Sequence, residues 1–342
     1  MRETSDQPTS SLEVRIHPMK PTLWRQRAAT ARKRIRSALL RRLRRLPVLG
    51  TRLARGWHAR RYRRQMKATL RLDPPVGFND LIIHRLLYDR DPRLKIVCDK
   101  LAVREMIRDR LGATYLIPLL GTWNDPRDID WQSLPDQFVL KPTHSSGPIA
   151  IVPYLVERVP EKLAGMARDW LRHDYFDSSL EWGYRDLPRR LMAEALLRGP
   201  DGLAPVEAHV LTFGGQVALI RILTGIKSTP TRRNDWFDRN GTRLDNFSGE
   251  VEQSGINLDQ RDIDAIVKAS ERMSAGFDHL RVDMYLTDNG LKIGELTPYH
   301  GAGLTVWRGP VQDEVLAAAW RDPGQIHRIS EIGATRRDGQ QA

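Results

Sequence analysis

The amino-acid sequence predicts a mixed fold in which α-helices are combined with antiparallel β-hairpins. Two runs of alternating polar and apolar residues flank Asp288-Asn289-Gly290, a pattern typical of a hairpin. A second pair of runs, 206–213 and 216–223, flanks Gly214-Gly215 in the same way. Elsewhere, apolar residues recur at helical spacing. The 342 residues are enough for one large domain or for two to three smaller ones.

Composition narrows the class of protein. An apolar fraction of 40% and nine tryptophans fit a folded globular chain. Cys98 is the only cysteine, which excludes an intrachain disulfide and a thiolate metal site and favours a reducing compartment. Apolar runs fall short of the ~20 residues that cross a bilayer, and no secretory signal pattern follows the charged start. We therefore expect a cytoplasmic protein.

Positive charge is concentrated near the N-terminus. Residues 14–72 contain 20 Lys or Arg and no Asp or Glu, so although the whole chain is +13, residues 73–342 carry −5. We interpret residues 1–72 as a basic arm that is partly helical or disordered. A basic helical segment at 20–71 could lie on an anionic membrane surface, at the inner face of the cell membrane. A solvated helical extension is an alternative. Nucleic acid is the less expected partner, because the arm lacks a nucleic-acid fold signature.

The folded body is expected to begin near residue 73. Asn79 or Asp80 can cap a helix that ends at Asp91-Pro92. Asp99 is the expected N-cap of a second helix over 100–110, with a strand at 115–120 after it. Lys100 would then lie at a helix N-terminus, where anions bind, although a solvated lysine is the common alternative.

A flap follows in the centre of the chain. Strands are predicted at 138–142 and 149–152, and a small polar loop that ends in Gly147 joins them, as in flaps that contact phosphate through backbone N–H groups. Lys141 lies at the end of an apolar strand. It could bind a ligand there, or it could be a charge that protects an edge strand from pairing with another chain. After a helix at 161–173, the apolar strand 191–197 contains Glu194, which needs a partner such as a lysine or a ribose hydroxyl.

The C-terminal part places more polar residues within apolar elements. Arg221 lies inside an otherwise apolar strand, and 228–250 is a polar loop long enough for a substrate lid. A helical stripe at 263–273 precedes the hairpin at 281–297, and a glycine-rich loop at 298–303 follows it. The tail at 326–342 is expected to be disordered.

Two carboxylates in the last hairpin suggest a metal site. If its loop is the three residues 288–290, Asp283 lies opposite Glu295, and Arg281 lies opposite Thr297. Two carboxylates across an antiparallel pair repel each other, and a divalent cation removes the conflict. Magnesium suits them, because one or two carboxylates plus substrate phosphates usually hold it. A solvated hairpin face is the alternative, and a two-residue turn would place the carboxylates on opposite faces.

Taken together, these stretches resemble the ATP-grasp superfamily, and more narrowly its teichuronopeptide-biosynthesis (TupA-like) branch. The resemblance implies an α+β ATP-grasp fold in which two subdomains clasp ATP. We divide the chain into an N-terminal subdomain at 73–135, a central subdomain with the flap at 136–200, and a C-terminal subdomain with the metal site at 201–325. The motifs that carry the resemblance are Asp99 to Arg104, Phe138 to Lys141, His144 to Gly147, Arg281 to Tyr285 and Gly294 to Thr297.

The resemblance also implies roles for single residues. Asp283 and Glu295, with Thr297, would hold Mg²⁺, and Arg281 and Lys141 would stabilise the transferred phosphoryl group. The residues expected to bind ATP are Lys100, Lys141, His144, Ser145, Ser146, Gly147, Glu194 and Arg221. Three departures from the family pattern stand out: Thr297 in place of an asparagine, Glu207-Ala208-His209 in place of an Asp-Tyr-Lys type segment, and Pro148 after the flap.

The implied activity is an ATP- and magnesium-dependent ligase. A substrate carboxylate would become an acyl phosphate, and an amine would attack it to form an amide. By family analogy, the carboxylate would belong to a uronic acid or amino acid of a cell-surface polysaccharide or peptide polymer. Two alternatives stay open: a kinase of the same fold that phosphorylates a hydroxyl, and a non-catalytic nucleotide-binding scaffold recruited to the membrane by the arm.

Overall fold

A computed structural model describes residues 43, 46–199, 202–225, 231–244, 247 and 253–334. The chain divides into two units, Met1–Gly50 and Thr51–Ala342, and the second contains all the strands of the described residues together with the candidate site residues. Nearly all of the predicted arm up to residue 45, residues 335–342 of the predicted tail and part of the 228–250 loop lie outside the described residues.

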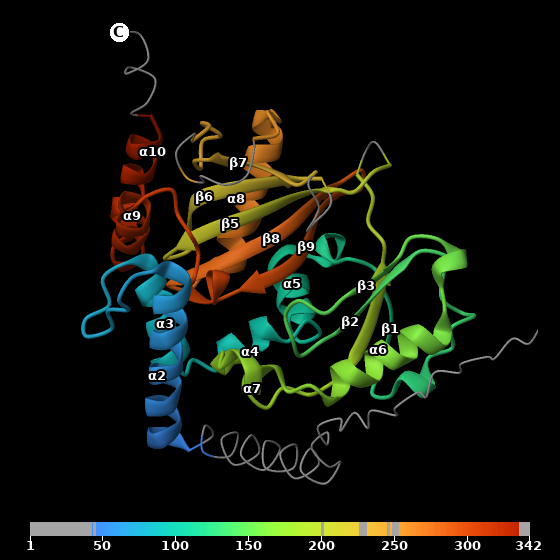
Figure 1. The fold of residues 1–342 in the computed structure, drawn as a ribbon. Helices are drawn as coiled ribbons and strands as arrows, with labels where there is room; N and C mark the ends of the chain where they lie inside the picture. The colour runs from blue at the N-terminus through green and yellow to red at the C-terminus, as the bar shows by residue number, and fades with distance from the viewer. Residues whose placement is uncertain are drawn as a thin grey trace, which may run out of the picture. The chain divides into compact units, whose positions relative to one another are not determined.

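Two antiparallel sheets organise the second unit (Figure 1). The first has the order β1-β4-β2-β3, and the second has the order β7-β6-β5-β8-β9. The strands of the first sheet are β1 (Leu119–Trp123), β2 (Phe138–Pro142), β3 (Ala150–Val152) and β4 (Leu191–Ala195). Those of the second are β5 (Val206–Phe213), β6 (Gln216–Thr224), β7 (Arg233–Phe237), β8 (His279–Thr287) and β9 (Gly290–Thr297).

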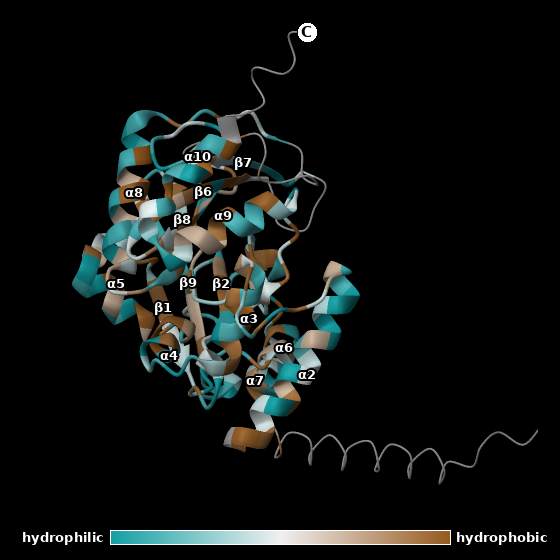
Figure 2. Cartoon of the chain, turned by 90° about the vertical axis from the view of Figure 1, so that its left-hand side faces the viewer, coloured by the Kyte–Doolittle hydropathy of each residue, from teal (hydrophilic) through white to brown (hydrophobic). Residues whose placement is uncertain are grey.

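Helices pack on both sheets through apolar stripes. Ile266 and Met273 of α8 are buried against the second sheet, as is Ile107 of α5. Ala167 of α6 is buried against the first sheet. Figure 2 shows hydrophobic and hydrophilic residues together on α8, as this one-sided burial requires. The helices are α2 (Pro47–Met66), α3 (Phe78–Tyr88), α4 (Arg93–Cys98), α5 (Val103–Leu111), α6 (Pro160–Arg172), α7 (Tyr175–Ser179), α8 (Gln260–Ser274), α9 (Pro310–Arg321) and α10 (His327–Ala334).

Two segments that were expected to lie outside the folded body belong to it. Tyr62 of α2 is buried in the core together with Leu72, although both fall within the predicted arm. Ile329 of α10 is fully buried, although it falls within the predicted disordered tail. In both segments, apolar residues at helical spacing find a partner surface on distant elements. Net charge and position near a terminus therefore do not show whether a segment packs on the folded body.

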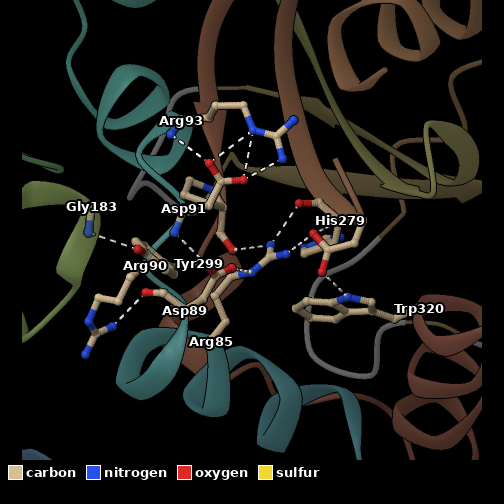
Figure 3. A network of polar contacts seen from close by, with 11 residues as sticks. Arg85, Asp89, Arg90, Asp91, Arg93, Gly183, His279, Tyr299 and Trp320 are labelled. Atoms are coloured by element: carbon tan, nitrogen blue, oxygen red, sulfur yellow. Dashed lines mark hydrogen bonds and ion pairs between the residues drawn. The ribbon is translucent and has the colours of Figure 1, made fainter. Parts of the chain in front are cut away.

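Arg85 of α3 ties together the two ends of the β8-β9 hairpin (Figure 3). Its Nη1 donates to the His279 carbonyl at 2.8 Å and to the Pro298 carbonyl at 3.4 Å. Its Nη2 pairs with the Asp278 carboxylate. The guanidinium thus contacts the start of β8 and the residue that follows β9. This charged clamp fixes the position of the hairpin on α3.

Candidate active site

The β8-β9 hairpin brings Asp283 and Glu295 onto one face, but not through the predicted loop. Thr287 pairs with Gly290, so the turn has two residues, and the expected three-residue loop is wrong. A β-bulge follows: Met284 pairs with Ile293, whereas Asp283 pairs with Glu295, which leaves Gly294 as an extra residue. The bulge restores the predicted pairs of Asp283 with Glu295 and of Arg281 with Thr297.

Gly294 is required at the bulge by close packing. A Cβ at this position would lie 2.6 Å from Cε2 of Tyr285. Across the sheet, the facing side chains follow one another in register as Trp236, Arg221, His209, Asp283 and Glu295. The carboxylate pair therefore ends a row of polar and aromatic side chains that crosses all five strands.

Basic side chains neutralise both carboxylates. Arg281 donates from Nε to Asp283 Oδ1 at 2.6 Å and from Nη2 to Oδ2 at 2.5 Å. Lys100 Nζ lies 3.5 Å from Glu295 Oε1. Burial alone would raise the pKa of Glu295, but Lys100, Arg281 and Lys141 together outweigh burial and lower it. Glu295 is therefore ionised at neutral pH and available to a cation.

The donor set fits magnesium that is shared with a nucleotide. Asp283 and Glu295 supply two carboxylates. The Thr297 hydroxyl lies 3.3 Å from Arg281 Nη2, on the same face of the hairpin. Among the described residues, no three His, Cys, Asp or Glu side chains form a group that could hold a metal. Since one or two carboxylates plus phosphate oxygens usually hold magnesium, the residues present fit that ion only together with a phosphate ligand.

Glu194 has two basic partners. Lys141 Nζ lies 2.5 Å from Glu194 Oε2, and Arg104 Nη1 lies 2.9 Å from Oε1. Arg104 also donates to the Ile117 carbonyl at 2.9 Å, which fixes α5 to the first sheet. The expected need of Glu194 for a partner is met by the lysine. Arg104 lies within the motif from Asp99 to Arg104, but the sequence alone does not show that α5 faces β4, so this contact is not predictable from it.

Lys100 joins the flap to the hairpin. Its backbone N–H donates to the Thr143 carbonyl at 3.0 Å, and its Nζ donates to the Ser145 carbonyl at 2.6 Å. Lys100 lies in the turn between α4 and α5 rather than in a first helical turn, since α5 begins at Val103. Asp99 accepts from the Leu101 and Ala102 N–H groups in this turn, so it orders the turn and does not cap the helix directly.

The flap residues differ in their exposure. His144 and Ser145 are buried, whereas Gly147 is exposed with a φ of 102° that favours glycine. His144 Nε2 lies 3.3 Å from the Trp170 carbonyl of α6, and burial lowers the pKa of His144. Ser145 Oγ and His144 Nδ1 are buried without a hydrogen-bond partner. Unsatisfied polar atoms of this kind are what a bound ligand would pair with.

Further cationic side chains line the same face of the second sheet. The Arg221 guanidinium lies 5.0 Å from the ring centre of Trp236, and its Nε lies 3.3 Å from Asn234 Oδ1. Burial, with Arg281 and Arg232 nearby, lowers the pKa of Arg221 to about 10. His209 Nε2 lies 3.9 Å from Asp283 Oδ2 and 3.3 Å from Glu207 Oε2.

Two more neighbours of this face were not predicted. Arg232 Nη2 lies 2.9 Å from Glu207 Oε2. Burial alone would raise the pKa of Glu207, but His209 and Arg232 lower it to about 2. His300, from the glycine-rich loop, places Nδ1 3.4 Å from Arg281 Nη1. Burial and Arg281 hold the pKa of His300 well below its ordinary value, which leaves a neutral ring that can accept from Arg281.

Two antiparallel sheets with a lysine, a serine and glycine flap and a facing carboxylate pair define the ATP-grasp class. Within this class, the chain belongs to the TupA-like ATP-grasp family, whose model matches residues 80–320. The predicted α+β ATP-grasp fold and its TupA-like branch are thereby confirmed. The roles of the single site residues and the subdomain boundaries stay predictions.

Solved structures with similar folds include several ATP-grasp enzymes. D-alanine–D-alanine ligase from Bacillus anthracis, complexed with ATP, is 17% identical with a TM-score of 0.40 and aligns over 77% of this chain and 70% of its own. The ATP-grasp ligase PsnB, complexed with Mg, ADP and a variant of its minimal precursor, is 12% identical with a TM-score of 0.40, over 69% of this chain and 60% of its own. N5-carboxyaminoimidazole ribonucleotide synthetase, complexed with ADP, is 11% identical with a TM-score of 0.40, over 60% of this chain and 46% of its own.

The chain thus spans about 60% of the length of PsnB. No curated protein matched the sequence. Across the described residues, every helix is too short or too polar to cross a membrane.

Proposed function

We propose that the protein is an ATP- and magnesium-dependent carboxylate-amine ligase that works through an acyl phosphate. The observation that carries the proposal is the pairing of Asp283 with Glu295 on one face, with Lys100 bridging Glu295 to the flap. A carboxylate pair, a phosphate-contacting flap and a bridging lysine are what binding a magnesium triphosphate requires. The family to which the chain belongs supports this function.

Magnesium would be held by Asp283 and Glu295, with Thr297 beside them, and would neutralise phosphate charge. Arg281 now covers both oxygens of Asp283, so it has to turn part of its guanidinium toward a bound phosphate. Arg281 lies on the same face of the hairpin as the carboxylate pair, where it could stabilise charge on the transferred group. Neutral His300 keeps Arg281 in this place by accepting from Nη1.

Lys141 and Lys100 would supply the remaining positive charge. Lys141 is held by Glu194, which orients its ammonium group before a nucleotide arrives. Lys100 holds the Ser145 carbonyl, so the flap is already tied to the element that bears Glu295. Preorganised charge of this kind avoids the cost of reorganisation at the moment of reaction.

The chemistry needs activation rather than a protein nucleophile. A carboxylate is a poor electrophile because its leaving group would be oxide. Once its oxygen carries the γ-phosphoryl group of ATP, phosphate can leave when an amine attacks the carbonyl carbon. The acceptor carboxylate would belong to a uronic acid or amino acid of a cell-surface polymer or its precursor. The arm would keep the enzyme near such a precursor at the cytoplasmic face of the membrane.

The test is to incubate the full chain with ATP, magnesium, a panel of uronic and amino acids and a panel of amines. Amide formation coupled to phosphate release supports the ligase. A phosphorylated hydroxyl would point to a kinase, and ATP binding without turnover would point to a scaffold.

Asp283→Asn should lower magnesium-dependent turnover by ~10²-fold or more, because one of two metal carboxylates is lost. Turnover is measured as ADP release over a magnesium titration. The control is Asp264→Asn, an exposed carboxylate on α8 that should change nothing. Unchanged turnover in Asp283→Asn would remove this residue from the metal site.

A further inference from the structure

Glu181 is a buried carboxyl that the proposed reaction has not used. Its side chain lies at the start of the 3₁₀ turn Trp182–Tyr184, and only 7% of the residue is exposed. Oε1 accepts a long hydrogen bond of 3.4 Å from the Tyr175 hydroxyl. Within the described part of the chain, no basic side chain lies at ion-pair distance from it. Glu194, Glu295 and Asp283 each have such a partner.

The backbone of Glu181 is fixed between two parts of the candidate site. A Cβ on Gly183 would lie 2.6 Å from Cys98 Sγ and 2.9 Å from the Leu94 carbonyl, so the turn packs tightly on α4, just before Lys100. The Gly183 N–H donates to the hydroxyl of Tyr299 at 2.9 Å (Figure 3), and Tyr299 lies two residues after Thr297, the last residue of β9. Glu181 is therefore held beside both the Lys100 turn and the end of β9.

A second path connects Glu181 to the flap. The Ser146 side chain of the flap also lies beside the Tyr175 hydroxyl that donates to Glu181. The neighbouring Ser145 has a buried Oγ without a partner, and its carbonyl accepts from Lys100. The flap, Tyr175 and Glu181 thus form a chain of polar groups beside the expected position of the phosphates.

The electrostatics of this position favour the neutral acid. Burial, with a contribution from the Glu295 charge, raises the pKa of Glu181 to about 7, although Tyr175 and Arg61 act in the opposite direction. A carboxyl that titrates near neutral pH can exchange a proton during turnover. The titratable groups that face it from the elements around it are Arg61 of α2, Cys98 of α4, Tyr175 of α7, Tyr184 of the 3₁₀ turn, Glu295 of β9 and Tyr299.

We propose that Glu181 binds the ammonium group of the amine substrate and takes its proton. The inference rests on the proposed ligase function and names the missing half of its substrate pair, a primary amine that arrives protonated. An ammonium ion is the partner that this buried carboxylate lacks. The nitrogen lone pair is occupied by a proton, so the amine cannot attack an acyl phosphate until that proton is removed.

The step balances in protons and charge. The ammonium transfers one proton to the Glu181 carboxylate, which gives a neutral amine and a neutral acid. The amine nitrogen then forms a bond to the acyl carbon while the bond from that carbon to the phosphate oxygen breaks. A second proton leaves the nitrogen with the departing phosphate, so the products are the amide and hydrogen phosphate. Glu181 later returns its proton to solvent.

The first experiment measures product formation with two nucleophiles, hydroxylamine and a primary amine. Each is tested on three proteins: the wild type, Glu181→Gln and Glu161→Gln, an exposed control on α6. Hydroxylamine is largely unprotonated at neutral pH and traps acyl phosphates without a base. Glu181→Gln should therefore form hydroxamate within ~3-fold of the wild-type rate and lose ~10²-fold or more in amide formation with a protonated primary amine. Equal loss with both nucleophiles would overturn the proposal.

The second experiment does not depend on turnover. Propylammonium chloride should raise the thermal unfolding temperature of the wild type and of Glu161→Gln more than propanol does, at matched ionic strength. Glu181→Gln should show no such difference. A propylammonium effect that is the same in all three proteins, or absent from the wild type, would overturn the amine site. If only the proposed ligase function were wrong, the wild type would form no hydroxamate. Propylammonium would still raise its unfolding temperature more than propanol does.

Discussion

Glu181 shows how one residue can trade stability for a chemical role. A carboxyl that is buried with a single hydroxyl partner costs folding free energy whenever it is charged. Its position is set by neighbours that leave no room for rearrangement, since Gly183 is packed against Cys98 and Leu94. The sequence offered no signal for it, because Glu181 lies in an irregular segment and its surroundings include the distant elements α2, α4 and β9.

This cost predicts how stability changes with pH. The pKa of Glu181 is about 7 in the folded protein and about 4.5 when unfolded, so the folded state binds the extra proton between these values. Stability contributed by this group is therefore present below pH ~4.5 and is lost as pH rises toward 7. Glu181→Gln should match the wild type at low pH and be more stable above pH 7 by ~1–3 kcal/mol.

Urea unfolding at several pH values checks this prediction, with Glu161→Gln as the control for charge removal. If Glu181→Gln were equally stable to the wild type at pH 8, or less stable, the Glu181 carboxyl would not be held in an environment that disfavours its charge.

At the scale of elements, the β8-β9 hairpin combines a correct and an incorrect prediction. The alternation of polar and apolar residues is confirmed, because Val282, Met284 and Leu296 are buried in the core. The turn was wrong by one residue, and on its own a two-residue turn would have separated the carboxylates. The bulge at Gly294 compensates, and its sequence signal was a glycine within a strand, which often marks a bulge.

Gly294→Ala should therefore disturb both stability and the site. The new methyl group would meet the Tyr285 ring at 2.6 Å, so either the ring moves or the bulge is lost. Loss of the bulge shifts β9 by one residue and turns Glu295 away from Asp283. We expect a loss of ~1–3 kcal/mol in unfolding free energy and a larger fall in ADP release than the loss of folded protein explains.

Gly290→Ala is the matched control within the same hairpin. Gly290 has a φ of 80° with no atom near its Cβ position, so alanine there strains the backbone without touching Tyr285. It should lose ~1 kcal/mol of stability yet keep ADP release per folded molecule. Wild-type stability and turnover in Gly294→Ala would show that the bulge does not set the carboxylate pair.

The site as a whole mixes what local patterns can show with what only tertiary contacts show. Lys141, Glu194 and Arg221 stood out because charged residues within apolar strands need partners, and Asp283 and Glu295 stood out because facing carboxylates repel each other. Arg104, Arg232 and His300 did not stand out, because a charged residue on an amphipathic helix or in a polar loop is expected in any protein. Their roles follow from which elements pack together.

At the scale of the whole molecule, composition identifies a basic segment, but the predicted arm extends too far along the chain. Charge alone cannot separate a free arm from a helix that packs by one face, as α2 does through Tyr62. Residues 14–46 still carry 12 Lys or Arg and no Asp or Glu. We propose that this part of the arm binds anionic membrane surfaces.

Deleting residues 1–46 keeps α2 intact and tests this proposal. The full chain should sediment with vesicles that contain phosphatidylserine and not with neutral vesicles. Binding should weaken between about 50 and about 500 mM salt, because each Lys or Arg near the surface contributes ~1 kcal/mol that salt screens. The shortened chain, checked for an unchanged unfolding transition, should lose vesicle binding and keep ADP release. Equal sedimentation of the two proteins would show that the arm does not bind the membrane and would leave the enzyme without this link to a membrane-bound substrate.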